Sequence, residues 1–410
     1  MGLSTSNTKI RMGIHNINDW VAAPGTLKFV APEPGWTKVT GYKRIQRPHE
    51  TGDGEQLHSL QGAQDTQLGN LAIRVRGLSG GGAGNGTSSS SSTKLDILYE
   101  MLNALCGVDA SDASGELADA VDAGTGASLV LNAATSFIVG NPVLVKGPSG
   151  YQARWITAVS GDTATLCRGL TTDLGVAEDP TENEAVYAGA HWYLRGGTNN
   201  HPHLFADIED SLDRWRLFGM LGNAQLRATA GEILHLVFPT LMGTKWDNDQ
   251  SLASPTYSEP TAGNEVKVIN CPVWIGSTLY MAHSIGFDFG LQTQPRPSDG
   301  APNGHYGYVA NKPFQAQLTM TLHYGSGTAP SEVSASTRNT FEGNDNRQDI
   351  LVQFGRSPGE CFALRMPDAH LEVSEASENG QKMLQVTARP SKPQGGSSAG
   401  ELGGVQLAVF

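Results

Sequence analysis

The stretch from Thr93 to Gly107 constrains the fold most, because it is the segment where every local signal favours a helix. Four leucines recur at helical spacing, namely Leu95, Leu98, Leu102 and Leu105. The opposite face holds Lys94, Asp96, Glu100 and Asn103. Thr93 suits the N-cap, and Gly107 suits a left-handed C-terminal cap. We therefore expect a helix over 93–107 with one buried face.

The rest of the chain is a succession of short alternating segments and turns, which is typical of β-strands. Glycine contributes 50 of 410 residues and charged residues only 17%, a composition that favours turn-rich β structure. The sequence predicts a mainly β protein, a β-barrel or sandwich with a flanking α-helix.

The length permits two or three domains, given a usual domain size of roughly 100 to 200 residues. We divide the chain into 1–119, an inserted β module at 120–195, and a second part at 196–410. The first part holds an N-terminal arm over residues 1–25, the predicted helix and a polar stretch at 46–69 that we interpret as a long loop. The last residues, 405–410, are apolar enough to add as a strand to another element.

Two glycine-rich stretches resemble catalytic or cofactor motifs but fail closer inspection. The run after residue 78 supplies Asn85, Thr87 and Ser89 where a dinucleotide fingerprint needs glycine or alanine, so it is better interpreted as a linker. Gly396 to Gly400 matches the hydrolase elbow formula but lies in a Gly/Ser tail without a preceding strand. We expect no catalytic residue and no cofactor.

A metal site is the other chemical possibility, and it also rests on weak spacing. His201 and His203 flank a proline and are followed by Asp207, Glu209, Asp210 and Asp213. Neither helical nor strand spacing fixes a third ligand, and solvated acidic turns are much commoner. The four cysteines are widely separated, which favours free buried thiols over a zinc site. We expect no bound metal.

The net charge and the hydropathy limit the kinds of partner that we expect for this chain. The net charge is −12, and residues 108–250 alone hold 18 acids against 8 Lys and Arg. An acidic chain is a poor candidate for binding nucleic acid, because the neutralisation of phosphates by Lys and Arg supplies most of the non-specific affinity. No apolar window approaches the roughly 20 residues that span a bilayer, so we expect a soluble, unsecreted product without a membrane partner.

Four stretches of the chain have a recognisable order of elements. They are the strand, loop and helix of 71–107, the module strands of 153–194, the strand pair of 222–238, and the closing unit of 314–389 with its short helix within 334–346. Together they resemble the tail tube (major tail) proteins of long-tailed bacteriophages. The likeness lies in the order of elements across most of the chain.

The resemblance implies a structural virion protein, not an enzyme, that polymerises into stacked rings around a conduit for DNA ejection. It implies contacts with copies of itself, with terminator and tape measure proteins, and with passing double-stranded DNA that is not specifically bound. The virion tail is the implied location, after assembly in the host cytoplasm. The chain is longer than many family members. Either it carries two tube domains, so that trimers form pseudo-hexameric rings, or the module decorates hexameric rings.

A second class fits the composition without the family. A carbohydrate-binding or adhesin-like β-sandwich protein of a virion would expose aromatics on one sheet face. Trp192, Tyr193, Trp215 and Trp246 are the candidates for that platform.

Overall fold

The computed structural model describes residues 8–15, 26–47, 58–78, 97–107, 121–131, 139–194, 201–209, 213–248, 256–258, 263–269, 271–297, 305–311, 315–325, 332–343, 346–378, 380–391 and 404–410. The described residues are mainly β-strand, with two short helices, which confirms the predicted class.

Six of the described strands form a closed barrel. They are β20 (Pro272–Ile275), β21 (Thr278–Asp288), β24 (Gln317–Tyr324), β26 (Arg347–Phe354), β27 (Phe362–Glu378) and β28 (Gln381–Pro390). The pairing runs β24-β28-β27-β26-β20-β21 and closes because β21 also pairs with β24. Alternation puts Leu318, Met320 and Val386 on the buried face, while Thr319 and Gln385 are on the other.

The short helix expected within 334–346 is α2 (Ala335–Phe341), which lies beside the barrel. Ser334 caps it by accepting a hydrogen bond of 3.2 Å from the Thr337 backbone N–H. The Phe341 ring packs edge-to-face on Tyr280 of β21, with ring centroids 6.2 Å apart. A two-residue strand, β25 (Glu332–Val333), leads into the helix and pairs with β24.

From β21 the sheet continues away from the barrel through β16 (Gln225–Thr229), β17 (His235–Met242), β4 (His58–Arg74) and β3 (Thr37–Arg47). A second sheet has the order β18 (Lys245–Asp247), β15 (Arg214–Met220), β14 (His203–Glu209), β1 (Lys9–His15), β2 (Thr26–Val30) and β19 (Thr256–Ser258). A separate hairpin joins β22 (Gln292–Pro297) and β23 (His305–Asn311).

Helix α1 (Ile97–Cys106) contacts β1, β2, β14 and β13 (Ala190–Tyr193). The predicted C-terminal cap is confirmed, since Gly107 has φ +97° and donates its N–H to Asn103 O at 3.0 Å. The predicted start at Thr93 lies outside the described residues. The apolar face is buried as expected, and burial extends to the opposite face as well: Glu100 is half-buried and every other residue of α1 is buried, Asn103 included.

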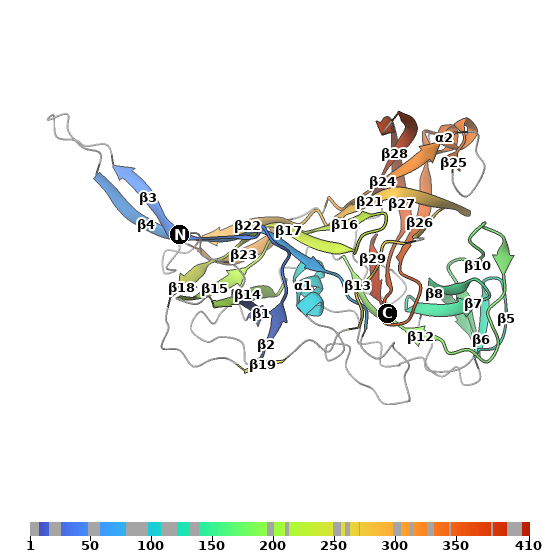
Figure 1. The fold of residues 1–410 in the computed structure, drawn as a ribbon, viewed down its shortest axis with the longest axis horizontal. Coiled ribbons are helices and arrows are strands. Elements are labelled where there is room, and N and C mark those ends of the chain that lie inside the picture. Colours follow the sequence, from blue (N-terminus) through green and yellow to red (C-terminus); the bar gives the residue numbers. More distant parts are fainter. Residues whose placement is uncertain are drawn as a thin grey trace.

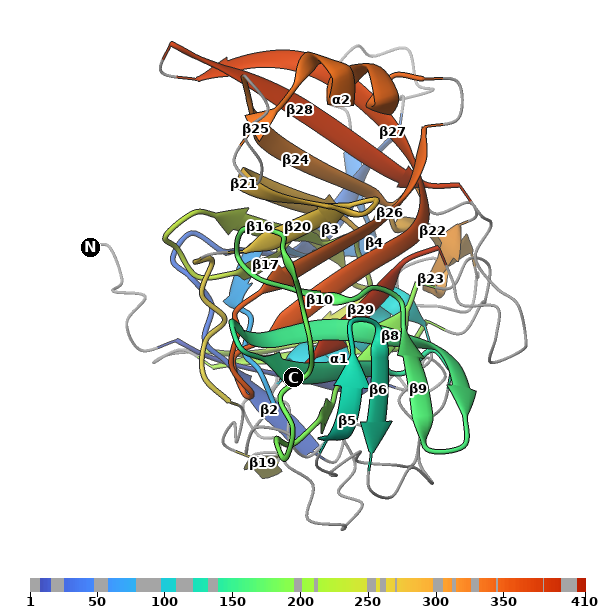
Figure 2. The ribbon, with the colours of Figure 1, turned by 90° about the vertical axis from the view of Figure 1, so that its right-hand side faces the viewer.

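Residues 121–188 form a module with its own sheet. Its strands are β5 (Val121–Thr125), β6 (Ser128–Leu131), β7 (Pro142–Gly147), β8 (Gly150–Ser160), β9 (Thr163–Leu166) and β12 (Tyr187–Ala188), with the small pair β10 (Leu170–Thr171) and β11 (Ala177–Glu178) beside them. A separate apolar cluster, including Leu129, Val143, Ile156 and Val186, fills it. Figure 2 shows this module in front of the large sheet.

The chain after the module returns to the N-terminal strands. β14 pairs with β1, and β17 pairs with β4, so strands from 196–410 share sheets with strands from 1–119. The apolar stretch at 405–410 contains β29 (Gln406–Val409), which inserts between β27 and β13 of its own chain and is fully buried.

The prediction of a long loop at 46–69 is wrong, because β3 runs to Arg47 and β4 begins at His58. The two strands pair from Thr37↔Gly69 to Arg47↔His58 and project from the body as a hairpin arm (Figure 1). The sequence of this segment lacks apolar alternation, so its strands are recognised from the cross-strand backbone pairing alone. Figure 1 places this arm and the module at opposite ends of the elongated molecule.

Candidate assembly interface

The base of the hairpin arm is held by two tryptophans. Trp215 of β15 and Trp246 of β18 lie with ring centroids 5.4 Å apart, and both pack against the main core. Trp246 Nε1 donates a hydrogen bond of 3.1 Å to Gly41 O of β3. The Lys38 ammonium lies 3.9 Å from the Trp215 ring centroid, a close cation–π contact. These contacts fix the direction in which the arm leaves the body.

Beyond its base the arm has little support within the described part of the chain. β4 pairs with β17 only as far as Gln67↔Met242, and the Thr66 carbonyl accepts from the Gly243 N–H. From Asp65 to His58 the only strand paired with β4 is β3, over about 25 Å at roughly 3.3 Å per residue. A lone two-stranded ribbon is marginally stable in water, so a second surface is expected to stabilise it.

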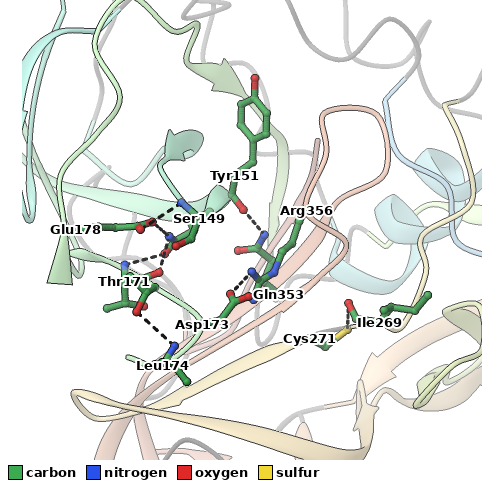
Figure 3. Close-up of polar contacts among 12 residues, drawn as sticks. Ser149, Tyr151, Thr171, Asp173, Leu174, Glu178, Ile269, Cys271, Gln353 and Arg356 are labelled. Carbon is green, nitrogen blue, oxygen red and sulfur yellow. Dashed lines mark hydrogen bonds and ion pairs between the residues drawn. The ribbon is translucent and has the colours of Figure 1, made fainter. Parts of the chain in front are cut away.

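At the other end, the module is joined to the barrel by a buried glutamine. Gln353 of β26 is fully buried, and its Oε1 accepts a hydrogen bond of 2.8 Å from the Ala153 N–H of β8. Its Nε2 donates to Tyr151 O at 3.0 Å and to Gly355 O at 2.9 Å. Figure 3 shows Gln353 between Tyr151 and Arg356. The amide thus bonds to two backbone groups of β8.

A buried cation lies beside this joint. The fully buried Arg154 guanidinium lies 4.5 Å from the Trp274 ring centroid of β20 and donates to Gly169 O at 3.0 Å. Burial lowers the pKa of Arg154 to about 10. An ion pair between Asp173 and Arg356 adds a further link between module and barrel. With these contacts the module has one defined orientation on the barrel.

A polar groove of about 560 Å³ crosses β16, β21 and β24. Asp288 is its centre, accepting hydrogen bonds from Asn223 Nδ2 at 2.6 Å, Gln225 Nε2 at 2.9 Å and the Gly290 N–H at 2.8 Å. The other polar side chains of its lining are Arg227, Gln292, Gln315, Gln317 and Thr319. The groove offers amide donors and acceptors and no exposed aromatic side chain, as suits a hydroxyl-rich ligand or water.

The described residues considered as metal ligands form hydrogen bonds and ion pairs within the folded chain. His201 Nδ1 lies 2.8 Å from Ala104 O, and burial lowers the pKa of this imidazole. His203 Nε2 lies 3.0 Å from Tyr308 O. Asp207 is fully buried and accepts from Arg11 Nη1 at 3.1 Å and Arg214 Nε at 2.8 Å. Nowhere in the described residues do three His, Cys, Asp or Glu side chains converge to hold a metal ion. Asp210 lies outside those residues.

The four candidate aromatics do not share an exposed sheet face. Trp192 is fully buried and donates from Nε1 to Asn103 Oδ1 at 2.7 Å. Half-buried Tyr193 donates from its hydroxyl to Gly140 O at 2.8 Å, while Trp215 and Trp246 hold the arm. The described cysteine thiols are free, and three of the four are buried. The glycine-rich stretches at 79–92 and 396–400 lie outside the described residues.

Sequence patterns gave no signal for Gln353 or for the Lys38–Trp215 contact. Gln353 pairs with a strand 200 positions earlier, and a lone glutamine in an apolar strand has no recognisable spacing. Residues brought together over such distances are visible only in the fold.

No protein-family model matches this chain, and no curated protein sequence matches it significantly. No helix among the described residues is long and apolar enough to cross a membrane.

Proposed function

We propose that this chain is a structural subunit of a bacteriophage tail tube, which polymerises into stacked rings that form the conduit for DNA ejection. The observation that carries the proposal is the arm: a barrel-bearing body extends one sheet into a rigidly rooted hairpin that has no partner strand over its outer part in the described residues. Such a ribbon gains stability when it docks on a second copy. The order of sequence elements that resembles tail tube proteins supports the same conclusion.

In this proposal the arm makes the axial contact between successive rings. Head-to-tail contacts that close laterally and repeat axially generate rings and stacks, and the arm extends beyond one end of the elongated body, obliquely to its long axis (Figure 1). The ring holds three or six subunits. The partners are copies of this chain, terminator and tape measure proteins, and double-stranded DNA that passes without specific binding. The location is the virion tail, following assembly in the host cytoplasm.

A second candidate is a carbohydrate-binding virion protein. The polar groove around Asp288 favours it, because fixed amides and a carboxylate suit sugar hydroxyls. The positions of the four aromatics weigh against it, since none forms part of an open platform with the others.

Negative-stain microscopy of the purified protein at increasing concentration, with native mass spectrometry, separates the two. Rings or tubes with a central hole and masses at three or six subunits are expected. Stable monomers and dimers alone, at every concentration, would contradict the tube proposal. Monomers that bind a glycan array would favour the second candidate.

A further inference from the structure

The joint between the module and the barrel contains three arginines. Arg154 and Arg168 belong to the module, and Arg365 belongs to β27. Arg154 and Arg365 are buried, and Arg168 is half-buried. Burial lowers the pKa of Arg168, and the charge of Arg365 lowers it further, against the opposing effect of Asp349. The three guanidinium groups thus lie close enough to repel one another.

The acids at the joint do not neutralise these cations. Asp349 pairs with Arg365, whose Nη2 donates to Oδ2 at 2.7 Å, while Arg168 Nη2 donates only to the Asp349 backbone O at 3.3 Å. Glu178 accepts from Gln152 Nε2 at 2.6 Å. Asp349 and Glu178 are the carboxylates whose charges most affect the three guanidiniums. Three cations and two anions leave the cluster with one net positive charge.

Two buried donors at the joint lack acceptors. Gln406 of β29 is fully buried, and its Oε1 accepts from Arg365 Nη1 at 3.4 Å. Because arginine can only donate, this bond identifies the other amide atom as the Nε2 donor. Within the described part of the chain, neither Gln406 Nε2 nor Arg168 Nη1 has a hydrogen-bond acceptor, although both atoms are buried. A buried donor without an acceptor is costly, so both atoms call for an acceptor ligand.

The strand register places Gln406 on the face that the module covers. Tyr193, Gln406 and Arg365 are direct cross-strand neighbours on β13, β29 and β27, so their side chains share one face of the sheet. The Tyr193 hydroxyl donates to Gly140 O of the module at 2.8 Å, which identifies that face. Arg168 reaches the same face from the module through its bond to Asp349. The amide and the guanidinium therefore belong to one enclosed polar joint.

We propose that this joint binds a small inorganic anion, such as chloride, which accepts hydrogen bonds from Arg168 Nη1 and Gln406 Nε2. An anion supplies both the missing acceptor and the missing negative charge, whereas a water molecule supplies only the acceptor. The enclosure favours an anion of one or a few atoms. The bound ion then links the module to the barrel, and this holds whether or not the chain forms tubes.

Two measurements on the full chain test the site. Crystals soaked in sodium bromide are examined for an anomalous difference peak within hydrogen-bond distance of Arg168 and Gln406. Thermal unfolding is compared in sodium chloride and in sodium gluconate, whose anion is too large for the joint. At a fixed ionic strength of about 0.2 M, chloride should raise the melting temperature by about 2 °C or more, because a ligand bound only by the folded state stabilises it.

The variant Gln406→Glu places a fixed carboxylate at the site, so it should melt at the same temperature in chloride and gluconate. Arg389→Met, which removes an exposed arginine of β28, is the matched control and should keep the chloride response of the parent. A chloride response that persists in Gln406→Glu, or its absence from the parent, would overturn the proposal and leave an adventitious ion only. If Gln406→Glu fails to fold, the bromide peak decides alone, and water without bromide at the site would overturn the proposal.

Discussion

Trp192 donates its indole N–H to the side-chain oxygen of Asn103 across 2.7 Å, which ties β13 to helix α1 on either side of the inserted module. Both residues are buried, and the Tyr99 ring packs edge-to-face on Trp192 at 5.7 Å between centroids. Helix α1 precedes the module in the chain and β13 follows it, so the bond links the segments on either side of the insertion. It therefore keeps the two ends of the insertion together inside the main core.

Asn103→Ala should destabilise the protein by about 1 to 3 kcal/mol, because a buried indole N–H loses its acceptor. Urea denaturation followed by fluorescence measures the loss. Trp192→Phe and the double variant complete a thermodynamic cycle, in which a favourable coupling between positions 103 and 192 is expected. Strictly additive losses would show that the bond contributes nothing beyond packing.

Gln353→Leu should loosen the module without unfolding it. The substitution keeps a similar volume but leaves the Ala153 N–H and Tyr151 O without their buried partner, at a cost of about 2 to 4 kcal/mol. Hydrogen exchange of β8 amides should accelerate at least tenfold, while exchange in the barrel strands changes little. Gln385→Ala, at an exposed position of β28, is the matched control and should leave both unchanged. Equal acceleration in module and barrel would mean that the joint is part of one global unfolding unit.

Shortening the hairpin arm should abolish tube formation and leave the fold of the body intact. Replacing residues 43–63 with Asn-Gly joins the cross-strand pair Tyr42↔Gln64 by a two-residue turn and leaves Leu68 in the core. Far-ultraviolet circular dichroism and the melting temperature should stay near those of the parent. Asp162→Ala, in the exposed β8–β9 turn, serves as the assembly control. If the shortened protein still gives tubes of normal length, the segment at 1–25 becomes the better candidate for the axial contact.

Double-stranded DNA should show no measurable affinity for the assembled protein at about 0.15 M salt. With 40 acids against 28 Lys and Arg, the chain lacks the excess cations needed to release phosphate counterions. Fluorescence anisotropy of a labelled duplex, titrated with protein at several salt concentrations, measures this. Micromolar, salt-sensitive binding would be incompatible with a wall along which DNA slides.

The Glu33–Arg74 pair should support the fold at neutral pH and lose its effect in acid. Arg74 Nε donates to Glu33 Oε1 at 2.5 Å, and this hydrogen bond lowers the pKa of Glu33. Because the folded-state pKa is depressed, the stabilisation is present above the ordinary carboxyl value and is lost as pH falls through the folded-state pKa. The melting temperature of Glu33→Gln should lie below that of the parent at pH 7, and the difference should shrink as the pH falls below the ordinary carboxyl value. A constant difference across that range would contradict the assignment.

The parts of the fold that were predictable from sequence are those with a local pattern. The helix over 97–106 and its Gly107 cap follow from leucine spacing and backbone preference, and the strands of the module follow from alternation and the turn at 160–162. The arm was missed because the sequence of its outer strands has no apolar alternation, so no period-two pattern exists to detect. The burial of Asn103 was missed because its partner Trp192 is 89 positions away.

The surfaces proposed for assembly were even harder to predict from the sequence. The order of elements suggested polymerisation, but the direction of the hairpin arm depends on the contacts of Trp215 and Trp246 at its base. Neither tryptophan is distinguishable by residue type from Trp192, which lies in the core. Their geometry comes from contacts between distant strands, which only the folded chain specifies.

The burial of β29 between β13 and β27 has a consequence for biosynthesis. Ala408 pairs with His191, 217 positions earlier, and with Ala363 on its other side. During translation β13 therefore emerges long before the strand that covers its edge, and the sheet stays open until residues 406–409 have left the ribosome. A chain arrested before that point exposes two unpaired edges to chaperones and proteases. Cellular quality control can thus distinguish chains that still lack residues 406–409 from chains in which this strand has closed the sheet.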